Sequence, residues 1–149
     1  MAGLTVSMST VGLQAKVTFL KKGAQSGLKT GVSEAAMLFE EEAKALVPVR
    51  SGELQDHIHT ETVTDSADEQ VLMVTPIDEA ANKYGFDPPY ARRIEMGFVG
   101  TDSLGRHYHQ APEPFMRPAF DNKVDAAKDA ITNGVYEGLD AAMSEAGGH

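Results

Sequence analysis

The chain has 149 residues, a length that fits one domain, and 42% of them are hydrophobic, which is enough to form a core. Its 13 Lys and Arg residues against 22 Asp and Glu give a formal net charge of −9, which disfavours a protein that binds DNA through bulk positive charge. The absence of cysteine excludes disulfides, thiolate catalysis and cysteine-ligated zinc. No apolar run reaches roughly 18 residues and the start has no basic and apolar signal pattern, so we expect neither a membrane span nor a secretory signal.

Two short elements are predicted before a long helix begins. Residues 4–9 alternate apolar and polar side chains, as a half-buried strand does. Residues 11–21 fit both a helical face and a β-rich run, and we interpret them as a helix. The glycines within residues 21–27 interrupt the pattern and predict a break there.

An amphipathic helix is expected over residues 28–47, because apolar side chains recur there at helical spacing over several turns. The residues on this face are Val32, Ala35, Ala36, Phe39, Ala43, Leu46 and Val47. Ser26 or Thr30 is placed to cap its start. Pro48 ends it, since the residue before a proline is pushed out of the α region.

A hairpin is predicted next in the chain, after an extended turn that contains Pro48 and Gly52. Residues 57–64 and 70–77 are rich in Val, Ile and Thr, and the polar residues between them suit a hairpin loop. Residues 78–89 are typical of a loop. Residues 90–97 fit a short helix or an irregular strand.

Residues 98–113 contain several chain breakers and no periodicity, so we expect a long projecting loop. Loops of this length in compact domains are often functional. A final helix is expected from near Pro114 or Pro118 to about Ala146, with a frayed tail over residues 144–149, because proline suits the first helical turn. Its apolar face carries Phe120, Val124, Ala127, Ile131, Val135, Leu139 and Met143.

Two glycines, Gly134 and Gly138, lie four residues apart inside this last helix. Each costs about 1 kcal/mol relative to Ala in a helix interior, so they indicate a bend or a close approach by a neighbour. Together these elements predict a single α+β domain over residues 1–149. Two long amphipathic helices pack on a small, mainly antiparallel β-sheet, and a long loop projects from it.

Metal chemistry is a weak alternative. His57 and His59 are expected on one face of a strand, and His107 and His109 have the same spacing in the loop, so the four could form a site with Glu95 or Asp102. Two-residue spacing of histidines also arises by chance, so surface or interface histidines are the favoured interpretation. No phosphate-binding loop, nucleophile elbow or metalloprotease motif is present, so we expect no enzyme, metal or cofactor.

Aromatic residues flank the expected loop and suggest contact with other molecules. Phe115 and Tyr90 suit the core, whereas Phe98 and Tyr108 suit an intermolecular contact, because aromatic anchors are enriched at interfaces. The candidate interface is Arg92, Arg93, Glu95, Phe98 and Tyr108. A surface salt bridge within the subunit is the plain alternative for Glu95 and the two arginines.

Three blocks in order resemble one family. They are "AKALVPVRSGELQDHI" (43–58), "YARRIEMG" (90–97) and "PFMRPAFD" (114–121). This order is similar to the HK97 gp10-like family of tailed-phage neck and tail-completion proteins, over about residues 28–135. The chain departs from the family pattern at Ser51, at His57, after Glu95 and in a longer segment from Asp78 to Pro89.

The resemblance implies a structural junction and a virion protein. The junction would include Pro48, Gly52, Tyr90, Gly97, Pro114, Phe115 and Pro118, with the prolines holding the entry into the last helix stiff. The implied role is head–tail joining in the phage neck, after assembly in the cytoplasm of the host bacterium. Its implied partners are further copies of itself in a ring such as a hexamer, head-completion or connector proteins, and tail-terminator or tail-tube proteins.

The acidic charge suits a protein beside which genomic DNA passes without specific binding. Three alternatives stay open: a tail terminator that caps the tail tube, a His-dependent metal-binding protein, and a small regulatory protein absent from the virion.

Overall fold

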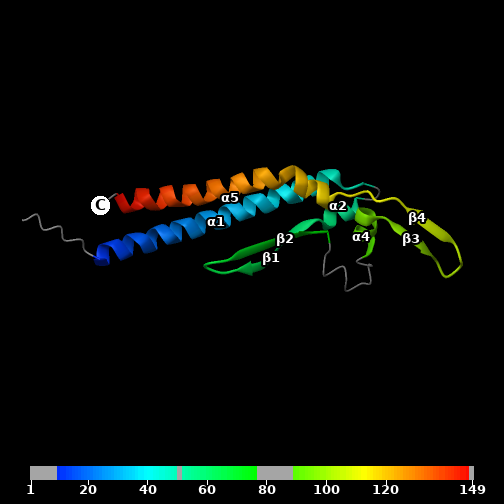
Figure 1. The fold of residues 1–149 in the computed structure, drawn as a ribbon, viewed down its shortest axis with the longest axis horizontal. Coiled ribbons are helices and arrows are strands. Elements are labelled where there is room, and N and C mark those ends of the chain that lie inside the picture. Colours follow the sequence, from blue (N-terminus) through cyan, green and yellow to red (C-terminus); the bar gives the residue numbers. More distant parts are fainter. Residues whose placement is uncertain (1–9, 50–51, 77–88, 148–149) are drawn as a thin grey trace, which may run out of the picture.

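The computed structural model describes residues 10–49, 52–76 and 89–147. Two long helices, α1 (Thr10–Leu46) and α5 (Met116–Gly147), lie side by side as an elongated stem (Figure 1). Between them in sequence come α2 (Glu53–His57), β1 (His59–Asp65), β2 (Gln70–Thr75), α4 (Pro89–Met96), β3 (Phe98–Thr101) and β4 (His107–Gln110). The α+β fold class is confirmed, and its antiparallel pairing is divided between two two-stranded sheets. The strand expected at residues 4–9 and most of the loop expected at 78–89 lie outside the described residues.

The stem is held together by backbone contact between glycines. Gly23, Gly27 and Gly31 of α1 face Gly134 and Gly138 of α5. A Cβ atom added to Gly27 would lie 2.0 Å from the carbonyl oxygen of Gly134, and one added to Gly138 would lie 2.2 Å from that of Gly23. The close approach expected at the two glycines of the last helix is therefore confirmed.

The predicted break at residues 21–27 is wrong, and α1 runs through it without interruption. Glycine weakens an isolated helix by about 1 kcal/mol per residue, but here each one allows the partner helix to approach closely. Ser26 and Thr30 consequently lie inside α1 and cap nothing, and the Thr30 hydroxyl donates to the carbonyl of Ser26 one turn earlier. At the other end α5 continues to Gly147, close to the end expected near Ala146, and the fraying expected over residues 144–149 stays a prediction.

The first hairpin follows the prediction closely. β1 and β2 pair antiparallel from His59 opposite Thr75 to Asp65 opposite Gln70, with an irregularity at Val63. It runs along α1, back toward the free end of the stem (Figure 1). The start of this element differs, because His57 is the last residue of α2 and only His59 belongs to the strand.

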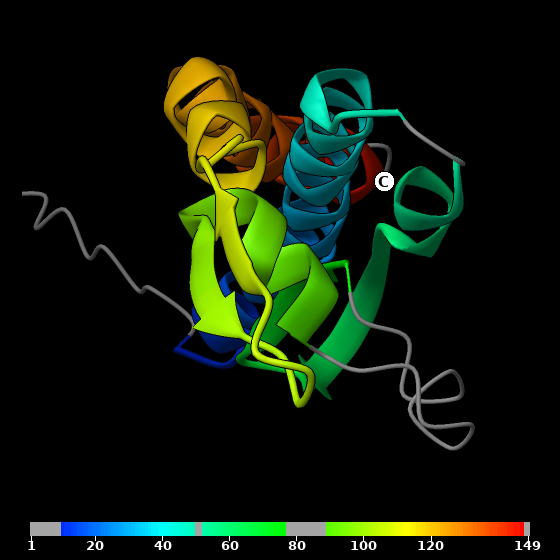
Figure 2. The same cartoon turned by 90° about the vertical axis from the view of Figure 1, so that its right-hand side faces the viewer.

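The second hairpin replaces the long loop expected at residues 98–113. β3 and β4 pair from Phe98 opposite Gln110 to Thr101 opposite His107, and the hairpin projects beyond the end of the stem (Figure 1). Gly97, with φ of 76°, turns the chain out of α4, and an added Cβ there would lie 2.8 Å from the carbonyl oxygen of Gln110. Seen along the stem axis, α4 and this hairpin lie on one side of the two long helices (Figure 2).

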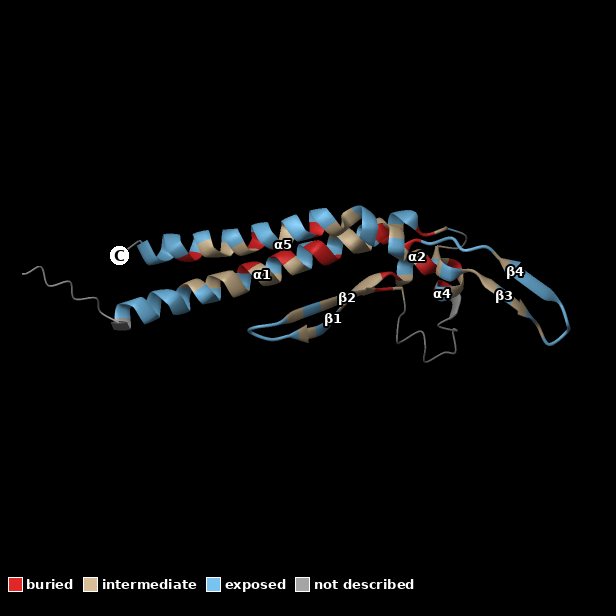
Figure 3. Cartoon of the chain, viewed as in Figure 1, coloured by how far each residue is buried: buried red, intermediate tan, exposed pale blue. Residues whose placement is uncertain are grey.

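A compact core joins the stem to the short elements. It consists of Ala43, Val47, Leu54, Ile58, Ala91, Ile94, Phe115 and Ala119. Figure 3 shows that buried residues gather where α2 and α4 meet the adjoining ends of the long helices, whereas most of the stem surface is exposed. Phe115 and Ile58 are the large side chains with no exposed surface among the described residues.

The expected junction residues have distinct local roles. Pro48 lies just beyond the end of α1, and Gly52 adopts φ of 84°, a left-handed conformation, directly before α2. Phe115 fills the core, and Pro118 lies in the first turn of α5, as its missing N–H permits. Pro114 precedes α5 and is exposed, and Tyr90 lies in the first turn of α4.

Phe120 is half exposed and stacks on Phe39 of α1, with the ring centroids 5.4 Å apart.

We predict that Gly27→Ala destabilises the fold by about 1–3 kcal/mol, because the added methyl overlaps the Gly134 carbonyl and the two backbones must separate. The higher helix propensity of Ala opposes this by about 1 kcal/mol. Urea unfolding measures the difference. Gly147→Ala is the control, since a Cβ there meets nothing within 4 Å. A Gly27→Ala protein as stable as the control would contradict the close backbone contact between α1 and α5 at these glycines.

Candidate interaction site

The projecting β3–β4 hairpin presents two different faces. Because side chains alternate along paired strands, Phe98, Gly100 and Tyr108 share one face, and Val99, Thr101 and His109 share the other. Val99 is 75% exposed, and Leu104 at the tip is 76% exposed. Exposed aliphatic side chains on a projecting hairpin suit contact with another molecule.

An aromatic and cationic stack occupies the first face. The Phe98 ring lies across Gly100, where an added Cβ would be 2.3 Å from the ring. The Arg93 guanidinium lies 4.5 Å from the centroid of the Phe98 ring, within cation–π range. Arg93, Phe98 and Tyr108 line an open pocket together with Thr101, Asp102 and the end of β4.

Asp102 organises the tip of this hairpin. Its Oδ1 accepts hydrogen bonds from the backbone N–H groups of Leu104 and Arg106, both at 2.9 Å. Its Oδ2 accepts from Arg106 Nε at 2.7 Å and from the Tyr108 hydroxyl at 3.0 Å. The backbone N–H of Arg106, followed by its side chain and the Tyr108 hydroxyl, lowers the pKa of Asp102 below its ordinary value of 3.8. One ionised side chain thus ties the turn to the aromatic face.

Glu95 fixes the base of the hairpin. Its Oε2 accepts the backbone N–H groups of Phe115 at 2.7 Å and Met116 at 3.0 Å, and its Oε1 accepts that of Arg117 at 3.0 Å. These N–H groups belong to the start of α5, where a helix has donors without internal acceptors and a partial positive charge. The carboxylate at the end of α4 is therefore the cap of α5.

Three of the five expected interface residues come together. Arg93, Phe98 and Tyr108 line the same pocket, whereas Arg92 is exposed on α4 and does not line it. Glu95 differs from the expectation, because both of its carboxylate oxygens bind backbone N–H groups within the subunit. The interface itself stays a prediction.

The two histidine pairs are not brought together in the way that the weak metal-site alternative requires. His57 ends α2, and the ring of His59 bridges the His57 carbonyl and Glu61 Oε1, each at 2.7 Å. His107 lies on β4 and its Nδ1 is 2.9 Å from the Thr101 hydroxyl. Within residues 10–49, 52–76 and 89–147, no three His, Asp or Glu side chains are grouped as metal ligands.

Sequence reasoning missed the roles of Asp102 and Glu95. The tip carried a usable signal, because Asp102 and Gly105 bracket a four-residue turn between two short runs with β-favouring residues. Glu95 carried none, since its acceptor role joins residues 20 to 22 positions apart.

Comparison with protein-family models, with curated proteins and with solved structures finds no match for this chain. Among the described residues, no helix is long and apolar enough to cross a membrane. The resemblance therefore rests on the three sequence blocks alone.

Glu95→Ala should lower the free energy of unfolding by about 1–3 kcal/mol, because three N–H groups at the start of α5 lose a charged acceptor. The free energy of unfolding of Glu95→Gln should lie between those of the parent and Glu95→Ala, since a neutral carbonyl accepts hydrogen bonds more weakly than a carboxylate. Urea unfolding measures both. Glu137→Ala, an exposed change in the middle of α5, is the control and should stay within about 0.5 kcal/mol of the parent. Equal stability of Glu95→Ala and the control would refute the cap.

Acid should loosen the hairpin tip. A carboxyl group whose pKa is depressed on folding stabilises the folded state above its ordinary pKa and loses that effect as the pH falls through the folded value. We therefore expect the Leu104 and Arg106 amide resonances to shift with acid at a midpoint below the ordinary carboxyl value of 3.8. An NMR titration measures this. Asp102→Asn should abolish the inflection, and an inflection above pH 3.8 would contradict the assigned contacts.

Proposed function

We propose that this chain is a structural protein of a tailed-bacteriophage virion. It would act in the neck at the head–tail junction, as a tail-completion or head–tail joining component present in several copies around a ring. The support is the ordered resemblance of three sequence blocks together with the way those blocks meet in the fold.

One observation carries the proposal: all eight residues of the core come from the three blocks. Residues 43–58 supply Ala43, Val47, Leu54 and Ile58; residues 90–97 supply Ala91 and Ile94; residues 114–121 supply Phe115 and Ala119. A chance match of three short motifs would not be expected to gather them in one cluster. Spatial convergence therefore favours a shared structural origin over coincidence.

A specific contact links two of the blocks. Glu95 of the second block accepts the N–H groups of Phe115, Met116 and Arg117 of the third. The family-like Glu and Pro-Phe motifs thus have a common physical purpose, since one caps the helix that the other opens. The resemblance thus includes residues that contact each other in the fold, and not only matching letters in the sequence.

The shape suits a subunit that meets several neighbours. The 37 residues of α1 span about 55 Å. The β3–β4 hairpin projects beyond the stem at the end where α1 finishes and α5 begins (Figure 1). Such a subunit can place its stem and its hairpin against different copies or against different proteins, as ring assembly requires. The formal charge of −9 is consistent with a wall that DNA passes without being held.

The first test is electron microscopy of lysates from a phage with an early stop codon in this gene. We expect filled heads beside unattached tails of normal length. Overlong tails would instead assign the chain to the tail terminator. Intact infectious particles would refute a virion role and leave the metal-binding or regulatory alternatives.

Complementation from a plasmid tests the hairpin within the same experiment. The parent gene should restore joined particles, and Phe98→Ala with Tyr108→Ala should reduce them, because both rings line the hairpin pocket. Tyr136→Ala is the matched control, since this aromatic side chain is 64% exposed on the stem, away from the hairpin. Equal rescue by both variants would remove the hairpin pocket from the proposed interface.

A further inference from the structure

Charge is strongly segregated between the β1–β2 hairpin and the first part of α1. Residues 59–75 contain four acidic residues, Glu61, Asp65, Asp68 and Glu69, and no Lys or Arg. Residues 10–33 contain four lysines, Lys16, Lys21, Lys22 and Lys29, and no Asp or Glu. The tip of the hairpin lies against residues 21–29 within this part of α1, and its base reaches Glu40 further along the helix, so the two oppositely charged segments meet at the tip (Figure 1).

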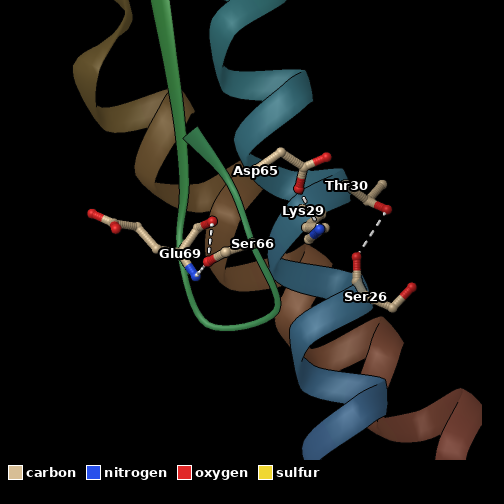
Figure 4. A network of polar contacts seen from close by, with 6 residues as sticks. All are labelled: Ser26, Lys29, Thr30, Asp65, Ser66 and Glu69. Atoms are coloured by element: carbon tan, nitrogen blue, oxygen red, sulfur yellow. Dashed lines mark hydrogen bonds and ion pairs between the residues drawn. The ribbon is translucent and has the colours of Figure 1, made fainter. Parts of the chain in front are cut away.

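The tip of the hairpin touches α1 through polar contacts. Lys29 Nζ pairs with Asp65 Oδ1, and Lys21 Nζ lies 3.2 Å from Asp68 Oδ1 (Figure 4 shows the first pair). Gln25 Nε2 donates to the same Asp68 oxygen at 2.8 Å. Residues 21, 25 and 29 recur every four positions and therefore lie on one face of α1. The Lys21 and Asp68 side chains are 63% and 73% exposed, and those of Lys29 and Asp65 are 37% and 53% exposed.

The turn that carries these aspartates is internally braced. The Ser66 N–H donates to the Glu69 carbonyl at 2.8 Å, and the Glu69 N–H donates to the Ser66 hydroxyl at 3.0 Å (Figure 4). Asp65 and Asp68 therefore belong to one hydrogen-bonded turn. The tip can meet or leave α1 as a unit without losing its own hydrogen bonds.

The base of the hairpin is anchored in a different way. Ile58 has no exposed surface, Thr75 is buried, and Val74 packs against the core. The Thr60 hydroxyl donates to Glu40 Oε2 at 2.6 Å. Within residues 62–72, all of them described, Leu72 is the single hydrophobic side chain that is not exposed. Little apolar burial holds the distal part of the hairpin on α1.

We propose that the β1–β2 hairpin is an electrostatically latched arm, which releases from α1 at its tip while its base stays in the core. Exposed ion pairs are weak and lose strength with salt, because the Debye length falls from about 10 Å at 0.1 M to about 3 Å at 1 M ionic strength. The anchored base does not depend on these pairs. Release uncovers a face of α1 that carries lysines and no carboxylate.

The absence of cysteine allows a clean distance measurement. Thr18→Cys on α1 and Ala67→Cys in the turn carry spin labels, since both side chains are exposed and Ala67 has no polar group to lose. Pulsed electron–electron double resonance then measures the distance between the label on α1 and the label in the turn. We expect one narrow distance distribution at low salt, and a second, longer one at about 1 M salt.

Charge reversal supplies the decisive variants. Lys21→Glu with Lys29→Glu should raise the open population at low salt on the order of tenfold, because two attractions become repulsions. Adding Asp65→Lys and Asp68→Lys should close the arm again with reversed polarity. Lys16→Glu with Lys22→Glu is the matched control, with the same change of charge on the same part of α1 but outside the tip contacts, and should leave the arm closed.

Two results would overturn the proposal. One is a distance distribution that neither salt nor the Lys21 and Lys29 reversal changes, which would mean that other contacts hold the arm. The other is an open arm in the four-residue reversal, which would mean that the charges do not form the latch. Circular dichroism of each variant checks that the helical stem remains folded, and the four-residue reversal keeps the test valid if the two-residue variant unfolds.

Discussion

The capping of α5 by Glu95 is the contact on which the position of the projecting hairpin depends. The β3–β4 hairpin lies between α4 and α5 in the chain, so the contact between these two helices sets the direction in which the hairpin projects. Three N–H groups converge on one carboxylate, and the Ile94 carbonyl accepts the Glu113 N–H at 2.7 Å across the same joint. Phe115 lies beneath it without exposed surface. A charged cap and a buried ring therefore hold the hairpin against a fixed base.

The stem follows a different rule, since its helices meet through backbone atoms. Glycines bring the helix axes so close that little side-chain volume lies between them, and small residues such as Ala35, Ala127 and Ala142 continue the buried seam. The larger side chains are displaced to the outside, where Phe120 and Met143 are both 53% exposed although their spacing predicted a buried face. Among the described residues the β1–β2 hairpin lies along one side of α1, and much of the remaining stem surface is exposed, which leaves such residues available to neighbours (Figure 3).

Sequence reasoning succeeded where a signal is local. Pro48 and Pro118 act within one helical turn, and the β-rich runs around residues 59–75 needed only a polar turn between them. It failed at Gly23 and Gly27, because a glycine that breaks a helix and one that faces another helix look the same until the partner is known. The four-residue strands β3 and β4 are too short to show a period, and the cap at Glu95 joins residues far apart in sequence. The candidate interface stays a prediction: Arg93, Phe98 and Tyr108 line one pocket, whereas both carboxylate oxygens of Glu95 accept backbone N–H groups within the subunit.

The two hairpins differ in the contacts that hold them in place. The β3–β4 hairpin is fixed at its base by the Glu95 cap and the core, and its tip is braced by hydrogen bonds to Asp102, so its shape is set within the subunit. The β1–β2 hairpin has an equally firm base, but its tip is held to the stem by solvent-exposed charges. A subunit that must fit several positions benefits from both, because a rigid projection gives specificity and a weakly held arm lets the same chain adapt at modest cost in free energy. Rigid and adjustable parts are thus separated along one stem, and the separation follows from where the chain places core residues and where it places only charge.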